Sequence, residues 1–280
     1  KGYRPLPSPI AGMMLDQTES KDASLIPLQI PELEDAKGIY SGGDVNCVIK
    51  DDDTLWCWGA SSFGQLGVLD KDTGGAINIY DKVAPRNILD IGRPTSISIG
   101  SDHSCVVGTG TRVACWGQNH YGQIGKGSTS NVWKPSQSNV DSAIDIDGAQ
   151  VSAGDGFSCF LTSDKTVSCA GDNSQAQLGL STEEKAISLE PIGVRIHNST
   201  DYLDDIIALS SGGSHTCAIR RIVAQDSTSV YCWGDNSKGQ LGKPSDGTPI
   251  IGASEVPATS ASSREICNKL FSLEPVTSAE

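Results

Sequence analysis

The string CWGDNSKGQLG, residues Cys232 to Gly242, occurs four times in the chain in related forms. The other copies are CWGASSFGQLG from Cys57, CWGQNHYGQIG from Cys115 and CAGDNSQAQLG from Cys169. A motif that recurs at nearly fixed intervals reports architecture before it reports chemistry. The chain is therefore a tandem array, and a single catalytic loop is a poor explanation of the string.

A second element precedes each copy and also ends in a cysteine. It reads SGGDVNC, IGSDHSC, AGDGFSC and SGGSHTC, and its cysteines are Cys47, Cys105, Cys159 and Cys217. These cysteines are 58, 54 and 58 residues apart. The repeat unit is too short for a domain and too long for one hairpin.

The residues inside each unit predict short antiparallel strands. SISIG, from Ser96 to Gly100, alternates with period two, and CVVGTGTRVAC after it has the β-branched residues and central turn of a hairpin. A Pro-led extended piece such as PRNI at Pro85 completes four strands. The predicted fold class is all-β, a β-propeller or an open propeller-like arc of four-stranded antiparallel blades, with four repeats visible.

The array divides the chain into three parts. A Pro-rich arm or cap is expected before the repeats and a tail after them. The arm covers residues 1–35, the tail covers 263–280, and the repeats cover about 36–94, 95–148, 149–205 and 206–262.

The pattern G-x-x-x-[ST]-C, a hairpin and then C-W-G-x-N-x-x-G-Q-L-G resembles the regulator of chromosome condensation repeat, in a cysteine-bearing version found in secreted and cell-surface proteins. The resemblance covers about residues 36–262. It implies four-stranded blades, usually about seven to a ring in the family. Members include a guanine-nucleotide exchange factor, a photoreceptor, a secreted inhibitor and receptor ectodomains, so the fold does not fix one activity.

Each position of the repeated string has a structural interpretation. We expect the glycine after each Trp slot to adopt a backbone conformation closed to other residues, the glutamine to satisfy backbone groups, and the aliphatic residue to fill the space between blades. Trp is expected to pack blade on blade. The residues are Gly59, Gly117, Gly171 and Gly234; Gln65, Gln123, Gln177 and Gln240; Leu66, Ile124, Leu178 and Leu241; and Trp58, Trp116 and Trp233.

Eight of the nine cysteines fall in pairs across the predicted hairpins. Their spacing does not suit a zinc site, whereas opposed positions on a hairpin are within reach of a disulfide. The predicted bridges are Cys47–Cys57, Cys105–Cys115, Cys159–Cys169 and Cys217–Cys232. They indicate an oxidising compartment, so we expect a secreted, extracellular or cell-surface protein. Cys267 is left over, which indicates an intermolecular disulfide.

Other features bear on compartment and partners. Asn198 opens an NST glycosylation sequon, a signal that also arises often by chance, and no apolar run is long enough for a membrane span. With 34 Asp and Glu against 21 Lys and Arg, the chain lacks the basic surface of a nucleic-acid binder. We therefore expect a protein partner, either a second copy or another extracellular chain.

No catalytic constellation stands out, and we expect no enzyme activity, no cofactor and no metal. The four histidines are scattered, and the acidic run at Asp201 to Asp205 lacks the ligand spacing of a calcium loop. The alternative is an enzyme whose site lies in a variable loop, such as 68–84 or 243–256, although neither contains His or Cys.

The favoured function is a secreted, non-enzymatic protein-interaction or structural module in an extracellular assembly. The alternative within that class is an ectodomain or inhibitor-like binder of a protein ligand. The hairpin with Arg220, Arg221, Ile222 and Val223 is five residues longer than its counterparts, so we expect it to protrude towards a partner or to be a tolerated insertion. Trp133 is either an interface anchor or a residue tucked against a neighbouring blade.

The number of repeats raises a question of closure. Four blades are fewer than the family usually closes, and an open arc exposes its two terminal blades. We expect that the chain does not work as an isolated closed monomer. The competing explanation is that these residues are the ordered part of a longer polypeptide.

Overall fold

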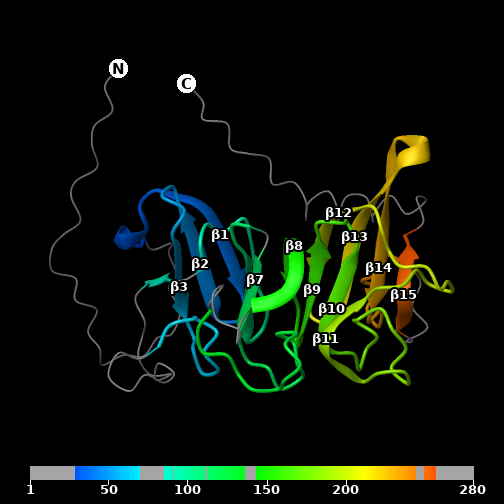
Figure 1. Cartoon of the computed structure of the whole chain (residues 1–280), viewed down its shortest axis with the longest axis horizontal. Coiled ribbons are helices and arrows are strands. Elements are labelled where there is room, and N and C mark those ends of the chain that lie inside the picture. The colour runs from blue at the N-terminus through cyan, green and yellow to red at the C-terminus, as the bar shows by residue number, and fades with distance from the viewer. Residues whose placement is uncertain are drawn as a thin grey trace.

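The computed structural model describes residues 29–69, 85–89, 91–110, 112–135, 143–243 and 249–256. This part of the chain is all-β, with two short 3-10 helices, η1 (Pro31–Leu33) and η2 (Val223–Gln225). Four blades stand side by side along the long axis of the molecule, in chain order from blue to orange (Figure 1). Of the predicted arm and tail, only residues 29–35 lie within the described residues.

Three hydrogen-bonded sheets make up the four blades. The first blade is a sheet of β1 (Ala36–Gly42), β2 (Val45–Lys50), β3 (Leu55–Gly59) and β4 (Arg86–Ile88). The middle sheet contains β5 (Ser96–Ile99), β6 (His103–Val107), β7 (Arg112–Gly117), β8 (Ala143–Ala153), β9 (Phe157–Thr162), β10 (Val167–Asp172) and β11 (Ile187–Gly193). The last blade contains β12 (Ile206–Ser211), β13 (His215–Ile222), β14 (Ser227–Gly234) and β15 (Ile250–Glu255).

The middle sheet holds two blades because β8 serves both. Its first residues pair with β7, with Ile144 opposite Val113, and its last residues pair with β9, with Val151 opposite Phe160. The strand bends between these two stretches (Figure 1). The second blade is therefore β5, β6, β7 and the start of β8, and the third is the end of β8 with β9, β10 and β11. The predicted division between residues 148 and 149 falls inside this continuous strand.

The central hairpins form where the sequence places a residue that tolerates left-handed backbone between two apolar runs. In the three short hairpins this residue is Asp53, Gly110 and Lys165, with φ of 64°, 79° and 63°. In the fourth hairpin η2 and Asp226, at φ 45°, take its place. Side chains of the flanking strands then pack on the blades before and after.

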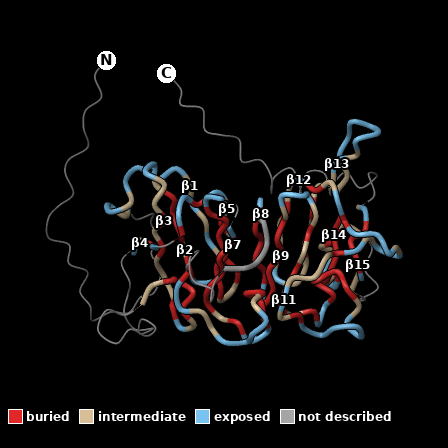
Figure 2. The backbone as a smooth tube through the Cα atoms, viewed as in Figure 1, coloured by how far each residue is buried: buried red, intermediate tan, exposed pale blue. Residues whose placement is uncertain are grey.

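The inner strands join the blades to one another. β5 contacts both β1 and β8, and β12 contacts β8. Hydroxyls on β5 support the next blade: Ser96 Oγ accepts from Val151 N at 3.2 Å and Ser98 Oγ accepts from Ala153 N at 2.9 Å. No described strand of the first blade pairs with the last blade, and the two lie at opposite ends of the molecule (Figures 1 and 2). The predicted propeller-like arc is confirmed, and its described part is open.

Buried apolar residues cluster at the three junctions between successive blades. Figure 2 shows that the buried positions follow the strands. The repeated string supplies the plug at each junction: Leu66, Ile124 and Leu178 are fully buried. The glycines of the string have the expected left-handed backbone, for example φ of 118° at Gly59 and 107° at Gly117. A Cβ at Gly117 would lie 2.6 Å from the carbonyl oxygen of Asp102, so a side chain is excluded there.

Candidate protein-interaction surface

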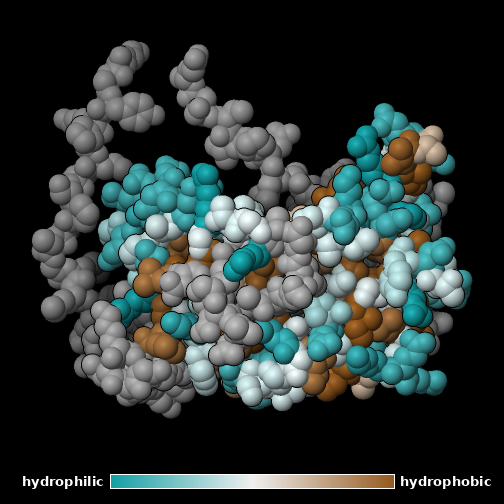
Figure 3. All heavy atoms as spheres, in the orientation of Figure 1, coloured by the Kyte–Doolittle hydropathy of each residue, from teal (hydrophilic) through white to brown (hydrophobic). Residues whose placement is uncertain are grey.

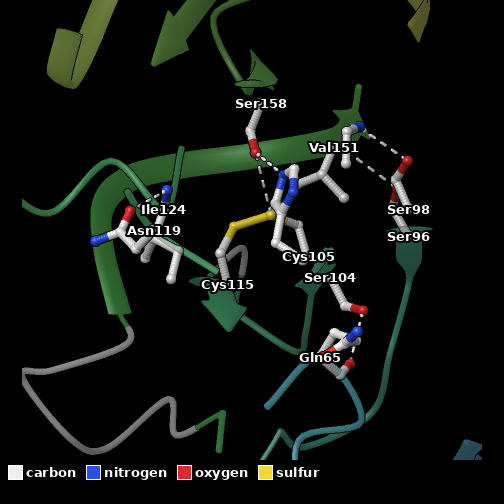
Figure 4. The surroundings of a disulfide bond; sticks show 12 residues. Gln65, Ser96, Ser98, Ser104, Cys105, Cys115, Asn119, Ile124, Val151 and Ser158 are labelled. Atoms are coloured by element: carbon white, nitrogen blue, oxygen red, sulfur yellow. Dashed lines mark hydrogen bonds between the residues drawn. A yellow bond between two sulfur atoms is a disulfide. The ribbon is translucent and has the colours of Figure 1, made fainter. Parts of the chain in front are cut away.

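Each blade carries one disulfide between directly opposed residues of its central hairpin. The structure has the four predicted bridges, Cys47–Cys57, Cys105–Cys115, Cys159–Cys169 and Cys217–Cys232, and each spans 4.1 Å between Cα atoms. Figure 4 shows the second of them, buried between blades with the Ser158 hydroxyl 3.5 Å from Cys105 Sγ. Closing a hairpin of this length stabilises the fold by about 2–3 kcal/mol through the unfolded chain. Cys267 lies outside the described residues.

A buried Ser–His pair lies beside the second disulfide. His103 Nε2 and Ser158 Oγ are 2.8 Å apart, which is the arrangement of a nucleophile and its base. Both side chains are fully buried at a blade junction, and burial lowers the pKa of His103 to about 4. A substrate has no access to the pair, so its role in this fold is structural.

The long hairpin of the last blade projects beyond its neighbours. β13 and β14 continue past the disulfide and end in η2, which stands above the other blades at the upper right of Figure 1. Val223 at its tip is 70% exposed, Arg221 is exposed and Ile222 is half-buried. In Figure 3 an apolar spot lies on this projection among hydrophilic atoms. An exposed apolar tip beside arginine is typical of a protein contact.

Arg220, the fourth residue predicted for this surface, has partners within the blade. Its guanidinium lies 5.8 Å from the ring centre of Tyr231 and forms an ion pair with Asp204. Arg221 pairs with Asp226 across the tip at 3.5 Å, and both side chains are largely exposed. The contacts of Arg220 therefore hold the base of the hairpin against the blade, whereas Arg221, Ile222 and Val223 form a tip that faces solvent.

Trp133 packs across a blade junction. It is 36% exposed, and a Cβ added at Gly64 of the first blade would lie 2.6 Å from its ring. The preceding residue, Val132, exchanges backbone hydrogen bonds with Gly117 of β7. These contacts give Trp133 a packing role between the first two blades.

Asn198 lies in an exposed turn between the third and fourth blades. Its backbone is left-handed, at φ 58°, and its side chain is exposed beside a groove of about 290 Å³. The residues before the turn pair with β15: His197 N donates to Ala253 O at 2.9 Å. The groove is shallow and lined by mixed side chains, and a glycan on Asn198 would stand at its rim.

One repeated role was missed in the sequence. The asparagine of the C-W-G-x-N string accepts the backbone N–H of the aliphatic plug at 3.0 Å in three blades, through Asn119 to Ile124, Asn173 to Leu178 and Asn236 to Leu241. The recurrence of Asn at this position in three copies was the available signal. In the first blade Ser61 takes the position, and its buried hydroxyl has no hydrogen-bond partner among the described residues.

The described part of the chain contains neither a cluster of metal ligands nor a helix suited to span a membrane. No group of three His, Cys, Asp or Glu side chains there is arranged to hold a metal ion. No helix there has the length and apolar character that crossing a membrane requires.

Two curated relatives are similar to this chain over part of their length. The chain is 30% identical over 196 residues to human "Probable E3 ubiquitin-protein ligase HERC6", covering 67% of this chain and 17% of that protein. It is 26% identical over 225 residues to the "Ultraviolet-B receptor UVR8" of Arabidopsis thaliana, covering 78% and 46%. The chain thus spans less than half the length of either relative.

Solved structures show the same fold. Yeast RCC1 (Prp20), in a crystal structure with Kap60, aligns with a TM-score of 0.63 at 16% identity over 80% of this chain and 49% of that chain. Human WBSCR16 aligns with a TM-score of 0.63 at 18% identity over 78% and 51%. At this level of sequence identity the structural similarity is evidence for a shared fold alone.

The match to a repeat family is direct. One form of the Regulator of chromosome condensation (RCC1) repeat matches residues 36–65, 95–123 and 149–177, and a second form matches 52–107 and 112–161. Together these matches run from the start of β1 into the third blade, in register with the blades described above. The chain belongs to the regulator of chromosome condensation repeat family.

Proposed function

We propose that this chain is a secreted, non-enzymatic protein-binding scaffold that presents the tip of the β13–β14 hairpin to a partner protein. The single observation that carries this proposal is the projection of that hairpin, with Val223 exposed at its end. Rigid blades that hold a variable loop are a common basis for recognition. Yeast RCC1, which has the same fold, was crystallised bound to Kap60, and this supports protein binding as a use of the fold.

The chemistry of the tip defines the kind of partner. Arg221 lies beside Ile222 and Val223, and the chain as a whole has a formal charge of −13. Apolar centres with arginine at the rim are enriched in protein interfaces. The fitting partner is a protein surface with an apolar depression that receives Ile222 and Val223.

A nucleic-acid partner fits the surface charge poorly. Asp44, Asp102 and Asp155 lie in the turns that join the first two strands of the first three blades. The pKa of the Asp102 carboxyl is raised by partial burial and by the charges of Asp155 and Asp44. Three neighbouring acidic groups would repel a phosphate backbone. This supports a protein partner.

An extracellular location is the second part of the proposal. Four disulfides in one small domain require an oxidising compartment to form and persist. Asn198 is exposed in a turn and serves in this proposal as the glycan acceptor, which mass spectrometry of its peptide tests. Within this setting, subunit of an assembly and ectodomain-like or inhibitor-like binder are two forms of one binding role. Of the loops named for an enzyme site, residues 70–84 and 244–248 lie outside the described residues, and residues 250–255 are not a loop but the strand β15.

Shortening the hairpin should weaken partner binding and leave the fold intact. Residues 221–228 are replaced by Ser-Asp-Lys, the turn of the β9–β10 hairpin, which removes the five residues by which the disulfide separations of 15 and 10 differ. The melting temperature should change little because η2 contains no buried residue. Binding is measured as capture of cell-surface or secreted proteins by the immobilised chain.

A matched pair of point variants separates the tip from apolar surface in general. Val223→Asp should abolish the capture of whatever the wild type captures, whereas Ile39→Asp, at an equally exposed position of the first blade, should retain it; both side chains are 70% exposed. Capture that survives both Val223→Asp and hairpin shortening would refute the proposal.

A further inference from the structure

The interface between successive blades has two unlike sides. The following blade supplies a cross-strand pair, Ser104 and Trp116 in the second blade, whose hydroxyl and indole N–H donate to the carbonyl oxygen of Gln65 at 3.0 and 2.9 Å. The last blade repeats this contact, because Trp233 Nε1 donates to the carbonyl oxygen of Gln177 at 3.0 Å. The pair that faces backwards is fully buried in the second, third and fourth blades; its members are Ser104 and Trp116, Ser158 and Ala170, and Thr216 and Trp233.

The preceding blade supplies the other side. It consists of the disulfide, the aliphatic residues two positions from each cysteine on the hairpin, and the turn whose Gln carbonyl oxygen accepts the Trp indole N–H. In the first three blades the disulfide and aliphatic residues are buried; they are Cys47, Ile49 and Leu55, Cys105, Val107 and Val113, and Cys159, Leu161 and Val167.

At the start of the arc the backward-facing side has no neighbouring blade among the described residues. Asn46 and Trp58 form the same cross-strand pair in the first blade, but both are only half-buried. Within the described residues, Trp58 Nε1 has no hydrogen-bond acceptor, unlike Trp116 and Trp233. The first blade thus presents the donor side of a blade interface.

At the end of the arc no described blade packs on the forward-facing side. Cys217, Ile219 and Val230 occupy the positions that are buried in the other three blades, and each is half-buried. Gln240, whose equivalents in the first three blades are buried, is also half-buried. The last blade thus presents the acceptor side of the same interface.

We infer that these two sides bind each other between copies of this chain, with the first blade of one copy packed on the last blade of the next. Every copy carries both sides, and the three internal junctions show that the two sides fit. Trp58 then donates to the backbone carbonyl of Gln240 in the second copy, as Trp116 does to Gln65. Such a contact is heterologous, so it extends head to tail. It deepens the assembly role in the proposed function but rests on the blade ends and not on the hairpin.

Charge sets the conditions for this association. Each copy carries a formal charge of −13, so two copies repel each other while their apolar ends attract. Salt shortens the range of the repulsion, from about 10 Å at 0.1 M to about 3 Å at 1 M. Association should therefore strengthen as salt is added, opposite to an interface built on ion pairs.

The test is sedimentation velocity of the oxidised full chain between about 1 µM and about 1 mM, where weak association is populated. The wild type should form dimers and longer species. Trp58→Asp places a charge on the donor side and Ile219→Asp places one on the acceptor side, and each variant alone should be monomeric. An equal mixture of the two variants should form a one-to-one dimer and nothing longer, because each retains the side that the other has lost.

Three further measurements keep the inference open to refutation. Ile187→Asp, a 39% exposed apolar position on the outer strand of the third blade, should associate like the wild type. The hairpin-shortened variant should also associate normally, which separates this inference from the hairpin proposal. Reduction of the Cys217–Cys232 bridge, in which Cys217 is half-buried, should slow as the chain associates. A wild type that stays monomeric over the whole range, or a mixture that fails to dimerise, would overturn the inference.

Discussion

Replacing Trp116 by alanine should lower the free energy of unfolding by about 3–5 kcal/mol, the usual cost of truncating a fully buried aromatic side chain. Trp116 fills the junction between the first and second blades, and its indole N–H donates to the carbonyl oxygen of Gln65. Truncation leaves a cavity between two sheets and removes one of the two donors to that carbonyl. Thermal unfolding with the disulfides intact measures the loss.

Trp58→Ala is the matched control for this prediction. Trp58 has the same position in its repeat, but it is half-buried and has no preceding blade among the described residues. The same truncation there should cost about 1 kcal/mol or less when the chain is dilute and monomeric. Equal losses at the two positions would mean that the first blade has a neighbour that covers Trp58, and the open arc would be wrong.

Acid should destabilise the protein through His103 well before its carboxylates are protonated. The folded protein keeps this buried imidazole neutral down to a pKa of about 4, whereas in the unfolded chain its pKa has the ordinary value of 6.5. Between these values the unfolded state binds more protons, so the free energy of unfolding falls as the pH falls. A shift of this size corresponds to about 3 kcal/mol, all of it lost between about pH 6.5 and about pH 4.

His103→Phe isolates this contribution, because the chain itself carries the fully buried Phe157 at the same position of the third blade. Each ring packs against a glycine three residues earlier, Gly100 for His103 and Gly154 for Phe157, so the replacement suits the site. The variant should lose less stability than the wild type between pH 6.5 and pH 4. Parallel pH profiles for the two proteins would show that His103 is not held neutral.

Much of the fold can be predicted from the sequence because the same residue types recur at the same positions of four repeats. Gly59 and its equivalents need left-handed backbone, Leu66 and its equivalents plug a junction, and the cysteines sit at opposed hairpin positions. Gln65 also behaves as predicted, since its side-chain oxygen accepts the backbone N–H of Phe63 at 2.9 Å. These roles depend on local backbone geometry and on the neighbouring blade, which the repeated pattern determines.

What the sequence could not reveal depends on position within the array. Trp58 and Trp116 are identical in motif, yet only the second is covered, because coverage requires a preceding blade. The shared strand β8 follows from a short connection between two blades, and its trace in the repeat pattern is the shorter spacing of 54 residues from Cys105 to Cys159, which does not by itself indicate a shared strand. The low pKa of His103 arises from its burial against Ser158, which lies in another blade. The proposed binding surface was harder to predict, because a longer hairpin indicates a protrusion but does not indicate its partner.

Peptide mapping of the unreduced protein tests the central claim most directly, which is that each blade is closed by its own disulfide and presents its surface from an oxidising compartment. The chain is isolated from its natural source with free thiols blocked before unfolding, and the crosslinked peptides are identified by mass. The account predicts four local pairs, Cys47 with Cys57, Cys105 with Cys115, Cys159 with Cys169 and Cys217 with Cys232. A crosslink between blades would contradict the fold of the repeats, and blocked free thiols at these eight positions would contradict the extracellular role.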